Sequence, residues 1–183
     1  DVVEINIKQK YVKVKDLKTD KIKKDTFDKL VFAGGTWPIK LPVEGADLKN
    51  IFFSKIFQHA QKIKAKANSK KVKDVVIIGA GYIGIELVEA FHQAGKKVTL
   101  IDMADRVIPR YFDSEFTDPL MKEMTKKKIK LATNQKTVKF LGDKKGNVTH
   151  GVTDKAKYKA DVVISAVGFL PQTQSLWVTD KEG

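Results

Sequence analysis

Residues 75–84, which read VVIIGAGYIG, decide the fold of this chain. Four apolar residues predict a buried strand, and the glycines that follow have the spacing G-x-G-x-x-G. In such a turn Gly79 permits the tight bend, Gly81 lets the backbone approach a diphosphate, and Gly84 lets helix and strand pack closely. The unpaired N–H groups and the positive dipole end of the following helix attract phosphates, so the stretch predicts a dinucleotide site.

The flanking residues extend this turn into a βαβ unit. A strand is predicted over 74–78, an amphipathic helix over 81–93 and a second, parallel strand over 97–102. Asp102 ends the second strand 18 residues after Gly84, where a carboxylate accepts hydrogen bonds from the adenosine ribose. A glycine-rich turn that serves packing alone is the alternative, and this terminal acid favours the dinucleotide site.

The charge of Asp102 also predicts which nucleotide is bound. A carboxylate at this position repels a ribose 2′-phosphate, which indicates NADH rather than NADPH. Arg106 is the opposing observation, because an arginine just past the strand could hold that phosphate. A surface ion pair with Asp105, which contributes little to stability, is the alternative role for Arg106.

The residues before this unit predict mostly β structure. Val2–Ile7 and Tyr11–Lys15 alternate apolar with polar residues, which indicates a small antiparallel meander. Lys29–Ala33 has the pattern of a short buried strand ended by two glycines. Ser54–Ala67 has apolar residues at helical spacing, with Ser54 as the expected N-cap.

The residues after this unit predict a further helix and four strands. Asp113 or Ser114 caps a helix that runs to about Lys128, and Pro119 inside it costs stability or marks a distortion. The last strand is nearly all apolar, which indicates burial on both faces of a parallel sheet. The predicted strands cover 129–132, 137–141, 148–153 and 161–167.

Composition excludes several classes of function. The formal charge of +13 suggests nucleic-acid binding, but only Arg106 and Arg110 are arginines, and scattered lysines more often form a solvated surface. We therefore expect no nucleic-acid partner. The chain has no cysteine, which excludes disulfides, thiolate metal sites and thiol chemistry by these residues, and fits a reducing cytosol.

Two further classes are disfavoured by particular residues. The longest apolar stretch, 75–88, is interrupted by glycines and Glu86 and is too short to cross a bilayer, so we expect no membrane span. His59, His92 and His150 match no metal or catalytic-triad spacing, and we expect no metal site. The chain opens at Asp1 with a polar, alternating segment, so we expect it to be an excerpt of a longer protein.

Several stretches beyond the glycines carry a family resemblance. GAGYIGIE at 79–86 and VTLID at 98–102 are followed by RVIPRYFD at 106–113 and AVGFLP at 166–171. Together these resemble the NADH oxidase, NADH peroxidase and coenzyme A disulfide reductase group of FAD-dependent pyridine nucleotide-disulfide oxidoreductases. Residues 27–38 similarly resemble the strand and turn where the family chain leaves its FAD domain.

The resemblance implies roles for single residues. Tyr82 shields the flavin and Glu86 faces flavin and nicotinamide, so these two are the candidate catalytic residues. Ile83 belongs to the cofactor-binding turn, Tyr111 lies along the adenine, and Gly168 lets the backbone approach the nicotinamide end. The alternatives are an exposed turn aromatic for Tyr82, a solvated helix residue for Glu86, and an ordinary core or surface aromatic for Tyr111.

The chain also departs from the family pattern. GGT stands at 34–36 where the family has Thr-Gly-Ser, and LPQ stands at 170–172 where it has Arg-Pro-Asn. The family's FAD fingerprint, redox cysteine, flavin ribityl motif and dimerisation domain have no counterpart in these residues. We therefore expect the 183 residues to be inactive by themselves.

These observations predict an α/β fold, a Rossmann-like doubly wound parallel sheet flanked by partial FAD-domain segments with an antiparallel β-meander. We assign Asp1–Asp47 to an FAD-binding domain, Leu48–Val167 to the NAD(H) domain, and Gly168–Gly183 to the return into the FAD domain. The resemblance implies a cytoplasmic, homo-oligomeric enzyme that passes hydride from NADH to FAD and on to oxygen. Peroxide or a disulfide is the alternative acceptor, and a non-catalytic NAD(H)-binding module is the alternative function.

Overall fold

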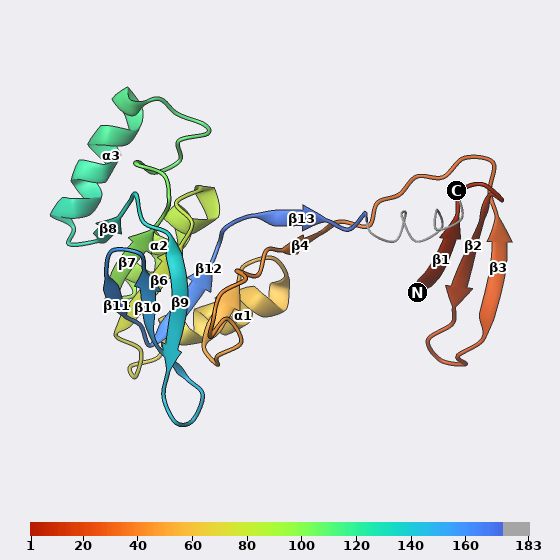
Figure 1. The fold of residues 1–183 in the computed structure, drawn as a ribbon, viewed down its shortest axis with the longest axis horizontal. Coiled ribbons are helices and arrows are strands. Elements are labelled where there is room, and N and C mark those ends of the chain that lie inside the picture. Colours follow the sequence, from red (N-terminus) through yellow and green to blue (C-terminus); the bar gives the residue numbers. More distant parts are fainter. Residues whose placement is uncertain (174–183) are drawn as a thin grey trace. The chain divides into compact units, whose positions relative to one another are not determined.

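The computed structural model describes residues 1–173, which belong to two compact units (Figure 1). Pro38–Phe169 form the larger unit, and Asp1–Trp37 with residues 170–173 belong to the smaller one. Strands β4 (Thr36–Pro38) and β13 (Phe169–Pro171) pair with each other at the two places where the chain passes from one unit to the other.

A five-stranded parallel sheet forms the centre of the larger unit. Its order is β5 (Ile51–Phe53), β12 (Val162–Ser165), β6 (Asp74–Ile78), β7 (Lys97–Ile101) and β8 (Lys130–Ala132). Every neighbouring pair in this order is parallel, which confirms the predicted α/β class and the burial of the last strand on both faces.

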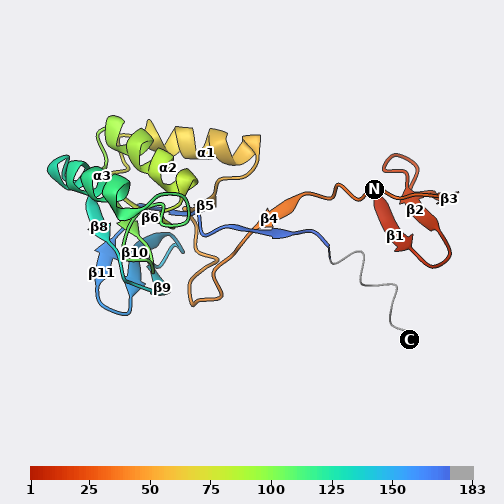
Figure 2. The ribbon, with the colours of Figure 1, turned by 90° about the horizontal axis from the view of Figure 1, so that it is seen from above.

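Three helices lie on one side of this sheet and three antiparallel strands on the other (Figure 2). The helices are α1 (Phe57–Ala67), α2 (Tyr82–Gln93) and α3 (Ser114–Lys126). The antiparallel sheet has the order β11 (Lys157–Lys159), β10 (Val148–Thr153) and β9 (Thr137–Gly142). The second face of the parallel sheet is thus covered by strands, where a doubly wound fold usually has helices.

Side chains of β6 alternate between the two faces of the sheet, so this strand contributes to the core on the helix side and to the core on the antiparallel-strand side. Val75 and Ile77 pack with residues of the three helices, whereas Val76 and Ile78 pack with residues of the antiparallel sheet. All four side chains are almost completely buried, because successive residues of a strand point to opposite faces. A strand this apolar is therefore stable only in the middle of three layers.

The smaller unit contains the predicted meander. Strands β1 (Val2–Asn6), β2 (Tyr11–Lys15) and β3 (Ile22–Thr26) form an antiparallel sheet in that order. Ile5 and Tyr11 are its buried side chains, and the Tyr11 hydroxyl donates a 2.5 Å hydrogen bond to Glu4.

The buried strand predicted over residues 29–33 is wrong. These residues are irregular, and the Val31 side chain is 89% exposed. An apolar run becomes a buried strand only where neighbouring strands and a covering layer are present. No strand in the described part of the chain pairs with these residues, so the apolar pattern alone was insufficient.

Ser54 is not the N-cap of α1, which begins at Phe57 after Ile56 in an extended conformation. Residues 51–53 instead continue the parallel sheet as β5, so Ser54 lies too early to reach the free N–H groups of the helix. The third helix begins after Asp113, as expected, although the Asp113 side chain makes no capping hydrogen bond, and it ends at Lys126, slightly before the predicted end. Pro119 lies inside it, where it cannot donate a helical hydrogen bond.

The contact between α2 and β6 generates a prediction about stability. A Cβ atom on Gly84 would lie 1.8 Å from the Gly79 carbonyl oxygen, whereas one on Gly81 would have no atom within 4 Å. We expect Gly84→Ala to lower the free energy of unfolding by about 2 kcal/mol or more, because α2 must move off the sheet. Gly81→Ala, the matched control, should cost at most about 1 kcal/mol. Urea denaturation of both variants checks this, and equal stabilities would contradict the packing role of Gly84.

Candidate functional site

The carboxyl edge of the parallel sheet gathers most of the predicted site residues. The glycine turn follows β6, Asp102 follows β7, and Gly168 lies shortly after β12. Because these strands are parallel neighbours, their carboxyl ends meet at one edge of the sheet. The Ala166 N–H donates to the Ile78 carbonyl and the Gly79 N–H donates to the Ile101 carbonyl, which ties the three strand ends together.

The three glycines of the turn are required for three different reasons. Gly79 has a φ of +102°, and a Cβ there would lie 2.4 Å from the Ala166 carbonyl oxygen. Gly84 allows the helix to approach the Gly79 carbonyl, as described above. Gly81 has an ordinary extended backbone and open space beside it, so only an approaching ligand would require its lack of a side chain.

The first turn of α2 presents N–H groups toward this open space. The first helical hydrogen bond runs from the Ile85 N–H to the Gly81 carbonyl. The N–H groups of Gly81, Tyr82, Ile83 and Gly84 have no acceptor among residues 1–173. Unpaired N–H groups at a helix N-terminus form an anion-binding site, so this turn fits a diphosphate.

The carboxylate of Asp102 makes two hydrogen bonds in this structure. Its Oδ2 accepts from the Ala80 N–H at 2.5 Å, and its Oδ1 accepts from the Ala104 N–H at 2.7 Å. The side chain is half-buried, and each carboxylate oxygen has a further lone pair for another donor. The position of Asp102 at the end of its predicted strand indicates a contact with the ribose, whereas its contact with the glycine turn has no sequence signal.

Ile108 contacts the same turn from the other side. Its N–H donates to the Ala80 carbonyl at 2.8 Å, and its own carbonyl accepts from Tyr111 and Phe112. The φ of Ile108 is +45°, a left-handed conformation that is rare for a β-branched residue and costs on the order of 1–3 kcal/mol. Ile108 thus ties the glycine turn to the aromatic residues that follow it, and sequence reasoning missed this residue.

Four aromatic side chains lie in contact at this end of the unit. The Tyr82 and Tyr111 ring centroids are 4.5 Å apart, and the Phe112 ring contacts Tyr82 edge-on at 6.4 Å. Phe116 in turn lies 6.2 Å from Phe112. All four are well exposed, which is unusual for such a group and typical of a surface that another molecule covers. Tyr82 and Tyr111 are predicted site residues, whereas Phe112 and Phe116 are not, because no sequence signal brings the four rings together.

Two site residues have few contacts. Glu86 lies one helical turn after Tyr82, is exposed, and forms no hydrogen bond or ion pair within the described chain. Gly168 has a φ of +116°, and its carbonyl accepts a 3.0 Å hydrogen bond from the Ile39 N–H. A left-handed backbone there requires glycine and leaves the turn after β12 without a side chain.

Arg106 forms the expected ion pair with Asp105, with 3.7 Å between nitrogen and oxygen. The Asp105 side chain is 64% exposed, so this pair contributes little to stability. The Arg106 Nε is buried without a hydrogen-bond partner among the described residues. Arg106, four residues after Asp102, therefore has a donor without a partner among the described residues.

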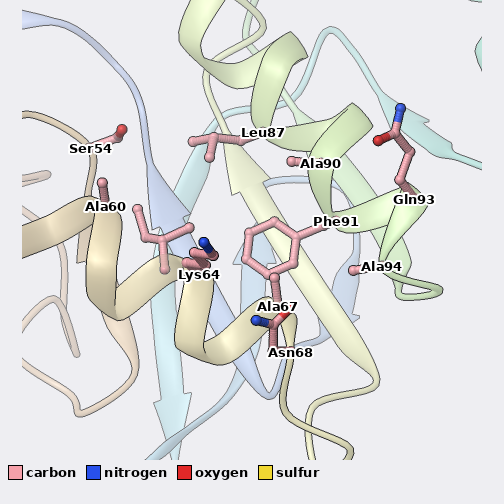
Figure 3. Close-up of a pocket in the computed structure, with 11 residues that line it drawn as sticks. Ser54, Ala60, Lys64, Ala67, Asn68, Leu87, Ala90, Phe91, Gln93 and Ala94 are labelled. Carbon is pink, nitrogen blue, oxygen red and sulfur yellow. The ribbon is translucent and has the colours of Figure 1, made fainter.

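A hollow of about 350 Å³ lies elsewhere, between α1 and the second half of α2 (Figure 3). It is lined mainly by apolar side chains, including Ile63, Leu87 and Phe91. None of the predicted site residues lines it. The glycine turn lies outside this hollow, and the space beside Gly81 is open.

Other kinds of site find no support in the described residues. Among residues 1–173 no helix is long and apolar enough to cross a membrane, and no group of acidic or histidine side chains could hold a metal ion. Burial, together with Lys157 and Lys159, lowers the pKa of His150, which keeps that ring neutral near pH 7.

Comparison with known proteins gives concordant matches. The family model for pyridine nucleotide-disulphide oxidoreductases matches residues 1–183. An NADH oxidase of Enterococcus faecalis is 43% identical over 96% of this chain and 39% of its own length. The water-forming NADH oxidase of Lactobacillus brevis bound to NADH has a TM-score of 0.88 and 37% identity, over 97% of this chain and 39% of that one.

A third relative has a different acceptor. An NAD(P)H coenzyme A polysulfide/persulfide reductase of Pyrococcus horikoshii is 39% identical over 85% of this chain and 37% of its own length. The chain thus spans about two fifths of the length of the relatives that it matches.

The contacts of Asp102 generate a prediction about stability. Asp102→Ala leaves the Ala80 and Ala104 N–H groups without their acceptor, and each such loss in a partly buried site costs about 1–3 kcal/mol. We expect its free energy of unfolding to fall by about 2 kcal/mol or more. Asp105→Ala, which removes only an exposed ion pair, should change it by less than about 1 kcal/mol. Urea denaturation measures the free energy of unfolding of both variants. An unchanged value for Asp102→Ala would show that these two hydrogen bonds do not form.

Proposed function

Because the chain belongs to the pyridine nucleotide-disulphide oxidoreductase family, we propose that it is the NAD(H)-binding portion of a flavin-dependent NADH oxidase. In the intact enzyme hydride passes from NADH to FAD and on to oxygen. The observation that carries this proposal is the row of unpaired N–H groups at Gly81–Gly84, which opens beside the Asp102 carboxylate. A diphosphate and a ribose that are linked as in NADH match these two neighbouring features.

The adenosine end of NADH lies at the outer part of this edge. Asp102 accepts hydrogen bonds from the ribose hydroxyls, and the exposed ring of Tyr111 stacks along the adenine. Stacking of a base on an aromatic ring contributes about 1–3 kcal/mol. Tyr111 is 60% exposed and so retains ring surface for the base beside its contact with Tyr82.

The nicotinamide end lies toward Gly168, Tyr82 and Glu86. FAD, the hydride acceptor of the intact enzyme, carries the redox chemistry, and this chain positions the nucleotide against it. Tyr82 fits a covering role because this residue is 48% exposed at the beginning of α2. Glu86 fits a role in orienting the carboxamide or pairing with a flavin-domain cation, because its carboxylate has no partner within the described chain. These two residues are the catalytic candidates.

The domain assignment is part of the same proposal. Asp1–Asp47 and Gly168–Gly183 belong to an FAD-binding domain, and Leu48–Val167 form the NAD(H) domain. The boundaries of the compact units, after Trp37 and after Phe169, lie near these positions without coinciding with them. Residues 174–183 of the last segment lie outside the described residues. The intact enzyme is a cytoplasmic homo-oligomer in this proposal.

The final electron acceptor is the point at which the alternatives differ. NADH peroxidase and coenzyme A disulfide reductase share the nucleotide site that we propose, and the coenzyme A persulfide reductase among the relatives favours keeping the second of these. A non-catalytic NAD(H)-binding module would need the same turn and no flavin. Assays of the intact protein with oxygen, peroxide and coenzyme A disulfide separate the enzymes, and absence of bound FAD would favour the module.

Gly81→Ala tests whether the turn binds the diphosphate. The added methyl group points into open space, so the chain should fold, but it would occupy the position of closest approach to the phosphates. We expect NADH affinity to fall by about tenfold to a hundredfold, which corresponds to the loss of one charge-assisted hydrogen bond. Calorimetric titration measures this. A glycine in a distant loop, Gly146, is unsuitable as a control because alanine would be strained at its φ of +77°. Lys145→Ala in the same loop is therefore the control. Unchanged NADH affinity of Gly81→Ala would exclude this site.

The charge of Asp102 predicts the choice of nucleotide. A 2′-phosphate beside this carboxylate would be repelled and would displace hydroxyl donors from it, so NADPH should bind at least about tenfold more weakly than NADH. Parallel titrations of the chain with the two nucleotides measure the ratio. Tighter binding of NADPH would instead assign the buried Nε side of Arg106 to the phosphate.

A further inference from the structure

The Ala80 peptide groups are held from two sides before any nucleotide binds. The Ala80 N–H donates to the Asp102 carboxylate at 2.5 Å, and the Ala80 carbonyl accepts from the Ile108 N–H at 2.8 Å. Both contacts come from the connection between β7 and α3, in which Asp102 and Ile108 are six residues apart. Ala80 itself is completely buried and lies between the first two glycines of the turn.

These contacts fix the direction of the next N–H group. In a trans peptide the carbonyl of one residue and the N–H of the next point in opposite directions. With the Ala80 carbonyl held toward Ile108, the Gly81 N–H must point away from Ile108, into the space beside the turn. The Asp102 bond likewise turns the Gly79 carbonyl toward Gly84, where the helix packs against it. Asp102 and Ile108, which bind the Ala80 peptide groups, thus orient the N–H group of Gly81 before an anion binds.

We propose that Asp102 is a positioning residue for the diphosphate turn, through its bond to the Ala80 N–H, in addition to its contact with the ribose. This inference rests on the proposed nucleotide site. The same carboxylate then serves both parts of the nucleotide, because one of its oxygens orients the turn while remaining lone pairs face the ribose hydroxyls. Preorganised donors bind an anion more tightly than donors that must first be ordered.

The negative charge of Asp102 and its bond to the turn predict opposite changes in nucleotide affinity when the Asp102 carboxylate is removed. A carboxylate close to a diphosphate repels it, so loss of the charge alone should strengthen the binding of a nucleotide that lacks ribose hydroxyls. Loss of the Ala80 bond should weaken the binding of that same nucleotide, because the turn is no longer held. The sign of the change therefore separates the two roles.

The experiment compares ADP with 2′,3′-dideoxy-ADP, which carries the same diphosphate and base without the ribose hydroxyls. Both are titrated by calorimetry into the 183-residue chain and its variants, below the unfolding temperature of each variant. Asp161→Ala is the matched control, because the Asp161 carboxylate also accepts two backbone N–H groups, from Lys73 at 2.8 Å and Asp74 at 3.0 Å. Those bonds lie at the opposite, amino-terminal edge of the sheet.

We expect Asp102→Ala to weaken the binding of dideoxy-ADP by about tenfold or more, which is the effect of losing one charge-assisted hydrogen bond. Asp102→Asn keeps one acceptor oxygen and should lose less, whereas Asp161→Ala should stay within about twofold of the parent chain.

Three results would overturn the inference. If Asp102→Ala loses ADP affinity but binds dideoxy-ADP as well as the parent chain or better, Asp102 acts through the ribose alone and the proposed function stands. If Asp161→Ala weakens dideoxy-ADP as much as Asp102→Ala does, the effect is a general loss of stability. If the parent chain binds neither nucleotide, the proposed nucleotide site fails together with this inference.

Discussion

The close contact between α2 and β6 is the constraint on which the rest of the site depends. Gly84 lies so near the Gly79 carbonyl that a single methyl group would not fit between them. This contact brings the beginning of α2 down to the carboxyl edge of the sheet, with its free N–H groups beside the ends of β7 and β12. A helix packed farther from the strand would have the same dipole but would present it away from Asp102 and Gly168.

The sheet then determines which residues can meet at that edge. Parallel strands have all their carboxyl ends on one side of the sheet, so residues far apart in sequence become neighbours there. The two buried layers hold this edge rigid, because β6 contributes side chains to both of them. Recognition of a flexible dinucleotide requires such rigidity, since each group that must be ordered on binding reduces the affinity.

The glycine turn, α2 and β7 could be predicted from the sequence because their signals are local. The strand over 74–78 was predicted with its observed bounds, and Asp102 was placed correctly at the edge. The contacts of Ile108 and the meeting of Tyr82 with Phe112 could not be predicted, since they depend on a left-handed backbone at a β-branched residue and on a long connection. Residues 29–33 show the opposite failure, in which a clear apolar pattern has no partner strand among the described residues.

The groups that we expect to bind the diphosphate are backbone N–H groups, and this explains why so little of the site is visible as residue types. A backbone donor leaves no trace in a sequence except the glycines that permit its approach. Gly81 is the plainest case, because neither its backbone conformation nor its packing requires a glycine. The close approach of a ligand to the backbone is the best explanation for a glycine at this position. The neighbouring Asp102 carboxylate indicates that this ligand also carries hydroxyl groups.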